Sequence, residues 1–297
     1  MLSRRGFLRT LFAGGAGFFS LGGYAFGIEP RLRLAVVRHD LALPQWPREA
    51  PPLTAAILTD LHASDPWMPI SRIEEIVEAT NRQAPDIVFL LGDYMASLRW
   101  QNRPLRPDEW ARPFAGLTAP LGVQAILGNH DYWWKGGPGP VVAALRAAGV
   151  AVRLNDAVRI EGGGHRFWVS GTESTLARRL ARGRYESRAD IVAALAAIDD
   201  DAPVIHLAHE PALVRHVPQR VAVTLSGHTH GGQIALPLIG PPLAGSHSIE
   251  WIHGAYTVSG RQLVVSAGLG CTFLPVRFMV PPEITLVRLS SSAAATV

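Results

Sequence analysis

The chain has 297 residues, of which 48% are hydrophobic and 18% are charged. This balance suits one large globular domain or two small ones, and it excludes collagen, coiled coils and intrinsic disorder. Residues 1–27 contain three arginines and no acid, so the formal net charge of +4 reduces to 25 basic and 24 acidic side chains in the remainder. A body this close to neutral gives no reason to expect a nucleic-acid polymer as partner. The single cysteine excludes an internal disulfide.

The first 27 residues have the pattern of an export signal. Ser3-Arg4-Arg5-Gly6-Phe7-Leu8 is followed by Arg9 and by an apolar, glycine-rich stretch over residues 11–27. This resembles a twin-arginine (Tat) signal, Ser/Thr-Arg-Arg-x-Phe-Leu followed by a basic residue. We expect the Tat translocase to export the protein to the periplasm or the outer face of the inner membrane. Cleavage after residues 25–27, a retained tether and an ordinary anchoring helix remain open alternatives.

The rest of the chain is divided by composition into three parts. Residues 28–52 contain five prolines and are predicted to hold a first strand over 32–38 and a connecting segment. Residues 53–290 form the main domain, and residues 291–297 form a flexible tail.

Within residues 53–290, apolar runs alternate with helical patterns. Ser71 to Glu74 predicts a capping box that opens a helix, and residues 140–148 predict a second helix that Gly149 ends. Strands at 262–266 and 283–289 are expected to complete a second sheet. Five further apolar runs are interpreted as buried strands: 53–59, 86–91, 122–127, 203–208 and 221–225.

Each of these five runs ends in side chains that can bind a metal. Because ligands bind at the carboxyl edge of the strands in open α/β sheets, we expect these side chains to meet in an α/β domain with two packed sheets. The glycines before three of them suit tight turns. The candidate ligands, in chain order, are Asp60, His62, Asp93, Asn129, His209, His228 and His230.

Carboxylate and imidazole ligands together suit Mn, Fe or Zn better than Mg or Ca. Seven ligands are too many for one tetrahedral ion and suit two ions that share a carboxylate. Two ions about 3.5–4 Å apart can hold a water between them, lower its pKa and stabilise an in-line phosphoryl displacement. The pattern therefore predicts two divalent ions per chain and attack by a bridging hydroxide.

The motifs resemble those of the calcineurin-like metallophosphoesterase superfamily, and the resemblance extends from about residue 53 to residue 289. In chain order they are Asp-x-His, Gly-Asp, Gly-Asn-His-Asp, a lone His and Gly-His-x-His. Residues 227–233 and 268–283 resemble a narrower branch, the exported bacterial phosphodiesterases of the YaeI and YkuE type. The resemblance implies a four-layer α-β-β-α sandwich with two mixed sheets and the site at the carboxyl ends of the strands.

The resemblance also implies a role for each ligand. One metal would be bound by Asp60, His62 and His230, and the other by Asn129, His209 and His228, with Asp93 as the bridge. His130 would be the catalytic residue that stabilises the developing charge and protonates the leaving oxygen. Asp131 is a candidate either to orient that imidazole or to cap a turn.

One departure from the family concerns the substrate. The arginine that follows Gly-Asp in the protein phosphatases of this superfamily is absent after Asp93, which argues against a phosphoprotein substrate. We expect a small-molecule or lipid phosphodiester of the cell envelope, and contact with a membrane surface. Trp67, Met68 and residues 132–135 either form an apolar wall for its organic part or pack a lid.

Two alternative functions remain open. One is a pyrophosphatase similar to the enzyme that cleaves UDP-2,3-diacylglucosamine, although that reaction is cytoplasmic and the leader argues against it. The other is a non-catalytic envelope-binding protein on the same scaffold. The sequence leaves the native substrate, the metals and the oligomeric state undecided.

Overall fold

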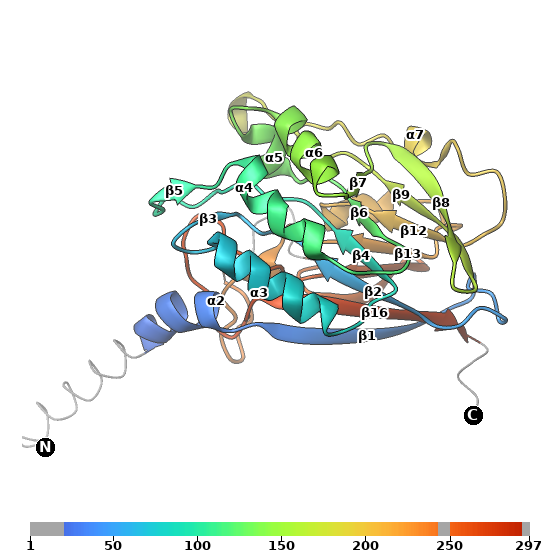
Figure 1. Ribbon diagram of the computed structural model, residues 1–297, viewed down its shortest axis with the longest axis horizontal. Helices are drawn as coiled ribbons and strands as arrows, with labels where there is room; N and C mark the ends of the chain where they lie inside the picture. The colour runs from blue at the N-terminus through green and yellow to red at the C-terminus, as the bar shows by residue number, and fades with distance from the viewer. Residues whose placement is uncertain (1–20, 243–249, 293–297) are drawn as a thin grey trace, which may run out of the picture.

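The computed structural model describes residues 21–242 and 250–292, so the twin-arginine motif lies outside the described residues. Two six-stranded mixed sheets form the body (Figure 1). In spatial order, the first sheet consists of β1 (Ala35–Leu43), β16 (Glu283–Ser291), β2 (Leu53–Leu58), β4 (Ile87–Leu90), β6 (Val123–Ala125) and β7 (Ala151–Val152). The second consists of β14 (Gly254–Val258), β15 (Arg261–Val265), β13 (Val223–Ser226), β12 (Val204–Leu207), β9 (His165–Gly171) and β8 (Asp156–Gly162).

Two small two-stranded sheets and several helices complete the described part of the chain. The small sheets pair β3 (Ser64–Asp65) with β5 (Arg103–Pro104), and β10 (Arg178–Arg179) with β11 (Tyr185–Glu186). The α-helices are α2 (Glu29–Leu32), α3 (Ile70–Asn81), α4 (Pro107–Ala111), α5 (Asn129–Trp133), α6 (Pro138–Ala147) and α7 (Ile191–Leu195). The π-helix η1 (Tyr24–Ile28) and the 3-10 helices η2 (Arg112–Gly116), η3 (Ala181–Gly183), η4 (Pro211–Arg215) and η5 (His230–Gly232) are short.

The apolar runs are continuous because both faces of each sheet are covered. In β2, Ala56 and Leu58 face the core under α3, α4 and α6, while Ala55 and Ile57 face the core between the sheets. The outer face of the second sheet is covered by α7 and η4. The fold is therefore a four-layer α-β-β-α sandwich whose second helical layer is reduced to short helices.

Five parallel strands have their carboxyl ends at the same edge of the sandwich. Strands β2, β4 and β6 run parallel in the first sheet, and β12 and β13 run parallel in the second. The predicted strands at these five positions are confirmed, each shorter than expected by one to three residues. Their carboxyl ends provide the framework of the site.

Three predicted elements exist but differ from the prediction in their bounds or their N-cap. The strand expected over 32–38 begins at Ala35, because Pro30 and the residues around it form α2 instead. Helix α3 begins at Ile70 with Pro69 as its N-cap, so Ser71 is already helical and caps nothing. The helix expected from residue 140 begins two residues earlier, at Pro138.

The C-terminal strand lies in a different sheet from the one expected. Strand β16 belongs to the first sheet, where it pairs parallel with β1 and antiparallel with β2. Only β15 of the two expected strands completes the second sheet, together with β14. Ser291, expected in the flexible tail, is the last residue of β16 and pairs with Leu43.

The segment that precedes β1 packs against the C-terminal part of the chain. Glu29 is buried, and its carboxylate accepts the backbone N–H groups of Met279 and Val280 at 3.0 and 2.7 Å. Ala25, inside the predicted leader, accepts the N–H of Arg277 at 3.0 Å. Among the described residues, no helix is both long and apolar enough to traverse a bilayer.

Candidate metal centre

All seven predicted ligands lie at the edge where the carboxyl ends of strands from both sheets come together. Asp60 and His62 follow β2, Asp93 follows β4, and Asn129 is the first residue of α5 after β6. From the second sheet, His209 follows β12, and His228 and His230 follow β13. Six of the seven form two compact groups of potential ligand atoms, one of Asp60, His62 and His230 and one of Asp93, His209 and His228.

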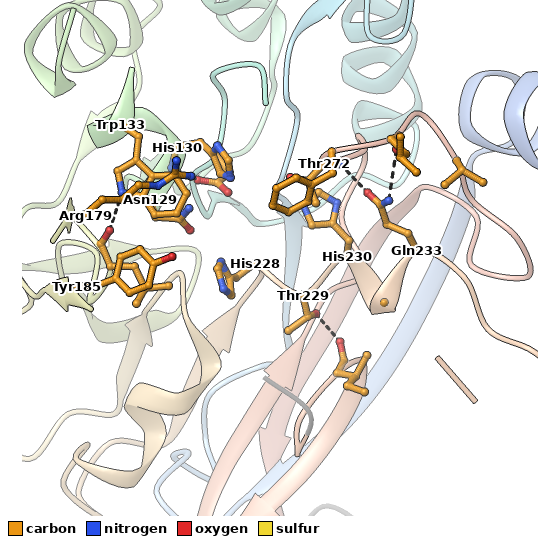
Figure 2. Close-up of a pocket in the computed structure, with 17 residues that line it drawn as sticks. Asn129, His130, Trp133, Arg179, Tyr185, His228, Thr229, His230, Gln233 and Thr272 are labelled. Atoms are coloured by element: carbon orange, nitrogen blue, oxygen red, sulfur yellow. Dashed lines mark hydrogen bonds between the residues drawn. The ribbon is translucent and has the colours of Figure 1, made fainter. Parts of the chain in front are cut away.

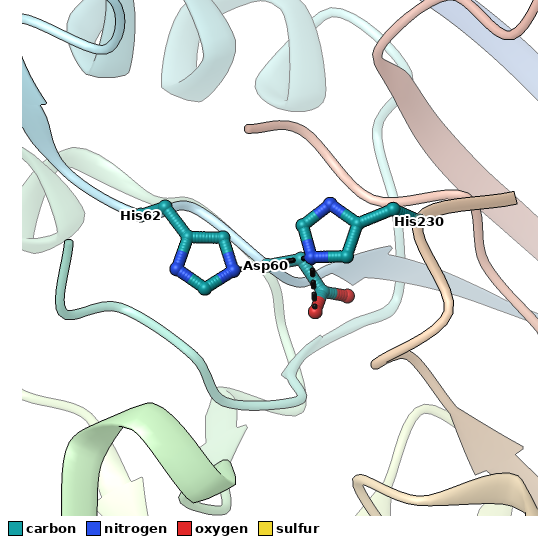
Figure 3. A group of neighbouring side chains, drawn as sticks. All are labelled: Asp60, His62 and His230. Atoms are coloured by element: carbon teal, nitrogen blue, oxygen red, sulfur yellow. Dashed lines mark hydrogen bonds and ion pairs between the residues drawn. The ribbon is translucent and has the colours of Figure 1, made fainter. Parts of the chain in front are cut away.

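The first group directs two imidazole nitrogens and a carboxylate at one point (Figure 3). The Nε2 atoms of His62 and His230 lie 3.1 Å apart, and Nε2 of His230 lies 3.3 Å from Oδ1 of Asp60. On the other side of each ring, Nδ1 faces a backbone carbonyl, that of Met95 at 2.9 Å and that of Gly270 at 3.4 Å. When Nδ1–H donates to these carbonyls, both Nε2 lone pairs face the centre, as in a metal site.

Asp93, a member of the second group, also reaches the first group. Its Oδ2 is 3.2 Å from Nε2 of His209 and 3.7 Å from Nε2 of His62, so one carboxylate oxygen reaches both sides. Nδ1 of His209 faces the carbonyl of Leu91 at 2.7 Å, which directs its Nε2 toward Asp93. This is the position that a bridging ligand requires.

Three buried polar atoms of the site have no hydrogen-bond partner in the described part of the chain. They are Oδ1 of Asn129, Nε2 of His209 and Nδ1 of His228. A buried acceptor without a partner costs about 1–3 kcal/mol, and native structures keep such atoms where they have another use. All three atoms are metal-ligand types, so the donor set fits a second divalent ion.

The electrostatics of the site favour positive charge at its centre. Burial by itself lowers the pKa of His209, but the neighbouring carboxylates of Asp93 and Asp60 raise it well above its usual value. Burial raises the pKa of Asp60. Two carboxylates removed from water thus need a cation beside them, which is the condition that a divalent metal meets.

Glycines allow the backbone to approach the two carboxylates. A Cβ atom on Gly128 would lie 2.2 Å from Oδ1 of Asp93, and one on Gly227 would lie 2.6 Å from Oδ2 of Asp60. Neither distance can be tolerated by a carbon atom. The glycines that precede Asn129 and His228 therefore serve close approach. Gly92 before Asp93 serves both a turn and close approach, because its φ is +96° and a Cβ on it would lie 2.2 Å from the backbone nitrogen of Gly128.

His130 lies beside the ligands at the edge of the pocket. Its ring centroid is 5.0 Å from that of His62 and 4.7 Å from that of Trp133, and its backbone N–H donates to Oδ1 of Asp93 at 2.8 Å. Burial lowers the pKa of His130 to about 3, so its imidazole is neutral at physiological pH.

Asp131 caps backbone groups, which is one of its two expected roles. Its carboxylate accepts the N–H groups of Asp93, Tyr94, Met95 and Gly128 at 2.9–3.1 Å. These bonds join the loop after β4 to the loop after β6, and they hold Asp93 and Asn129 in their relative positions.

A cavity of about 470 Å³ opens onto both groups (Figure 2). Trp133 forms part of its wall, with Tyr185 stacked on it at 5.7 Å and the Arg179 guanidinium 3.6 Å from its ring centroid. Ile252, Phe273, Leu274 and Val276 add apolar surface from the C-terminal half.

Sequence reasoning missed most of this cavity and misplaced part of its wall. Arg179 and Tyr185 belong to no motif. Gln233 and Thr272 lie in the stretches 227–233 and 268–283, which carried the resemblance but no predicted role. Only the folded chain brings these four side chains to the ligands. Met68 is buried in the core. The indole N–H of Trp67 donates to the carbonyl of Trp100 at 2.6 Å, outside the cavity lining.

Comparison with known proteins agrees with this geometry. Residues 53–232 match the calcineurin-like phosphoesterase family, and the chain belongs to that family. It is a metal-dependent phosphoester hydrolase.

Three relatives show how far the similarity extends. The chain is 29% identical to the uncharacterized metallophosphoesterase YkuE of Bacillus subtilis, over 98% of this chain and 99% of the relative. It is 28% identical to the phosphodiesterase YaeI of Escherichia coli, over 97% of this chain and the whole of the relative. An uncharacterized metallophosphoesterase of Aquifex aeolicus is 30% identical over 78% of this chain and 82% of its own length.

Proposed function

We propose that the protein is a phosphodiesterase with two metal ions, which acts on a small-molecule or lipid phosphodiester of the cell envelope. Asp60, His62 and His230 would hold one ion, Asn129, His209 and His228 would hold the other, and Asp93 would be shared between them. The mixture of carboxylate, amide and imidazole ligands favours Mn, Fe or Zn. When bound, two such ions supply an activated water and neutralise the charge that develops on the phosphoryl oxygens.

His130 is the proposed catalytic residue of the chain itself. It lines the cavity next to both groups, and its neutral imidazole can donate an N–H to the substrate. A hydrogen bond from that N–H stabilises charge on a phosphoryl oxygen. Protonation of the leaving oxygen requires the imidazolium form, which a bound anionic phosphodiester would favour. Trp133 limits the movement of the ring from one side.

The observation that carries the diester assignment is the apolar cavity that adjoins the ligands. A phosphomonoester offers a small, doubly charged group, whereas a diester carries one charge and two organic substituents. The cavity matches the diester, because Trp133, Ile252 and Leu274 can contact an organic group. Arg179 adds a cation to the cavity wall. It lies in a different part of the chain from the position after Gly-Asp, where the protein phosphatases carry their arginine.

The test is metal content and turnover of the purified protein after chelation, with Mn, Zn or Fe added back. Bis(p-nitrophenyl) phosphate is compared with p-nitrophenyl phosphate. We expect about two ions per chain, activity that depends on the added metal, and a higher kcat/KM on the diester. Absence of bound metal and of hydrolysis would contradict the proposal, and a preference for the monoester would contradict the diester assignment.

We propose that the Tat translocase exports the protein to the periplasm or to the outer face of the inner membrane. It rests on the arginine pair in the leader, Arg4 and Arg5, and on the apolar stretch that follows. The Tat route carries folded proteins, so the metals can be loaded before export. Arg4→Lys with Arg5→Lys is expected to retain the protein in the cytoplasm, as fractionation would show. Unchanged export would contradict the assignment.

A further inference from the structure

The large hydrophobic side chains exposed on this protein are not scattered. Eleven large hydrophobic side chains are exposed among the described residues. All except Leu180 and Val192 belong to four segments, 21–34, 96–101, 235–242 and 268–282. Monomeric soluble proteins rarely collect apolar side chains in this way without a partner for them. The nine, called here the apolar face, are Leu21, Phe26, Ile28, Leu32, Trp100, Leu238, Ile239, Phe273 and Met279.

Backbone hydrogen bonds hold the four segments together. Ala25 accepts the N–H of Arg277, and Ala235 donates its N–H to the carbonyl of Phe278 at 2.9 Å. The N–H of Arg99 donates to the carbonyl of Phe273 at 3.2 Å. Segments far apart in sequence therefore form one end of the molecule, the end where α2, β3 and β5 lie in Figure 1.

The charge of the apolar face has one sign. Glu29 is the only acidic residue in the four segments, and it is buried under the N–H groups of Met279 and Val280. Arg31, Arg33 and Arg99 are exposed. Asp65 of β3, at the same end, is partly exposed but pairs with Arg103 at 3.2 Å. Exposed apolar side chains flanked by arginines complement an anionic lipid surface.

We propose that the apolar face docks on a bilayer that contains anionic phospholipid. The chain that leads to the face supports this occupant rather than a second protein. Residues 10–20, directly before Leu21, contain no charged side chain, and Arg4, Arg5 and Arg9 precede them. An apolar stretch flanked by basic residues has the composition of a membrane-associated segment, and it joins the body at this face.

Docking would place the mouth of the cavity at the lipid surface. Phe273 is 56% exposed, belongs to the face and also lines the cavity, next to Leu274. The substrate is then an amphiphilic phosphodiester that enters with its apolar part on the bilayer side and its phosphate toward the ligands. This part of the inference rests on the proposed function, whereas the docking itself does not.

The test compares two variants of the full chain for binding to sedimented vesicles of phosphatidylethanolamine and phosphatidylglycerol. Leu238→Glu with Ile239→Glu changes two side chains of the face that do not line the cavity and are 108% and 73% exposed. Val192→Glu changes an exposed side chain on α7, outside the face, and is the control. The residues before Leu21 are the same in both, so a difference reports the face.

We expect the double variant to lose at least about tenfold in vesicle partitioning, and the control to bind like the parent. Binding of the parent should fall on vesicles of phosphatidylcholine alone, because the exposed arginines lose their partners. Turnover of soluble bis(p-nitrophenyl) phosphate should be equal in all three proteins. If the parent shows no turnover, the proposed function fails, but the partitioning still tests the docking.

Equal partitioning of the double variant and the control would overturn the proposal. So would a parent that is a dimer by light scattering and becomes a monomer in the double variant, since a second copy would then cover the face.

Discussion

Asp131 and His130 are adjacent in sequence but have different surroundings, so their substitutions should have different effects. Asp131→Ala leaves four backbone N–H groups without their acceptor, among them those of Asp93 and Gly128. A buried donor without a partner costs about 1–3 kcal/mol. We expect Tm to fall by roughly 5–10 °C and the bound metal to decrease. Thermal unfolding and elemental analysis measure both.

His130→Ala is the comparison. It removes a ring at the edge of the cavity and no acceptor of these amides, so metal content and Tm should stay near those of the parent, while kcat falls by about 100-fold or more. If Asp131→Ala instead kept its metal and Tm and lost only turnover, Asp131 would act through the imidazole and the capping interpretation would be wrong.

Arg179 is expected to contribute to substrate binding more than to the chemical step. Its guanidinium lies over Trp133 in the cavity wall, where it can meet the single charge of a diester. Arg179→Ala should raise KM for bis(p-nitrophenyl) phosphate by about tenfold and change kcat less.

Arg178→Ala is the matched control, because Arg178 adjoins Arg179 and pairs with Glu186 outside the main cavity. Steady-state kinetics of the two variants separate a local role from a general loss of positive charge. Equal changes in both would contradict the assignment of Arg179.

Among the elements, strand position was predictable and strand partner was not. The sequence predicts a strand at 283–289, yet this strand lies between β1 and β2 rather than in the second sheet. An apolar run records that both of its faces are buried, but it does not record which distant strand supplies its hydrogen bonds. The ligand positions did not depend on this choice, because each directly follows its own strand.

The beginning of β16 connects to the second sheet through one ion pair, which predicts a pH-dependent contribution to stability. Glu283 is buried and bonds to His253 at 2.9 Å and to the N–H of Ala267 at 3.1 Å. The hydrogen bond with Glu283 raises the pKa of His253 from 6.5. Burial raises the pKa of Glu283, but the bond with His253 and the other bonds lower it overall.

A raised imidazole pKa stabilises the fold below pH 6.5, and this stabilisation is lost as the pH rises through the folded-state value. The lowered pKa of the Glu283 carboxyl stabilises the fold at pH values above the ordinary carboxyl pKa, and this stabilisation is lost in acid. His253→Gln should therefore lower Tm by roughly 1–3 °C near pH 6 and have a smaller effect near pH 9. A difference that grows with pH would contradict this sign.

At the scale of the whole molecule, the sequence predicted features that depend on neighbouring residues, but not contacts between segments that are distant in the chain. The strand ends and the residues directly after them were readable, because motif and structure coincide within a few positions. Arg179 and Tyr185 reach the cavity from β10 and β11, a two-stranded sheet without a periodic signal. The role of Asp131 could not be decided either, since its partners lie 36–38 residues away along the chain as well as in its own turn.

Backbone strain occurs in the metal centre, where five of the thirteen left-handed non-glycine residues in the described part of the chain lie, and it predicts how the molecule responds to chelation. Left-handed backbone conformations cost on the order of 1–3 kcal/mol each in non-glycine residues, although Asp and His adopt them more readily than most. Five proposed ligands have such a conformation, with φ of +47° to +72°: Asp60, His62, Asp93, His228 and His230.

Metal that binds only the folded chain offsets this cost, by about 4 kcal/mol at a thousandfold excess over Kd. Chelation should therefore lower Tm by roughly 8–16 °C, and added Mn or Zn should restore it. Asp93→Asn is the control, because it removes the carboxylate between the two groups and should make Tm nearly independent of metal. If chelation left the Tm of the parent unchanged, the strained loops would be held by protein contacts alone and the metal would not contribute to the fold.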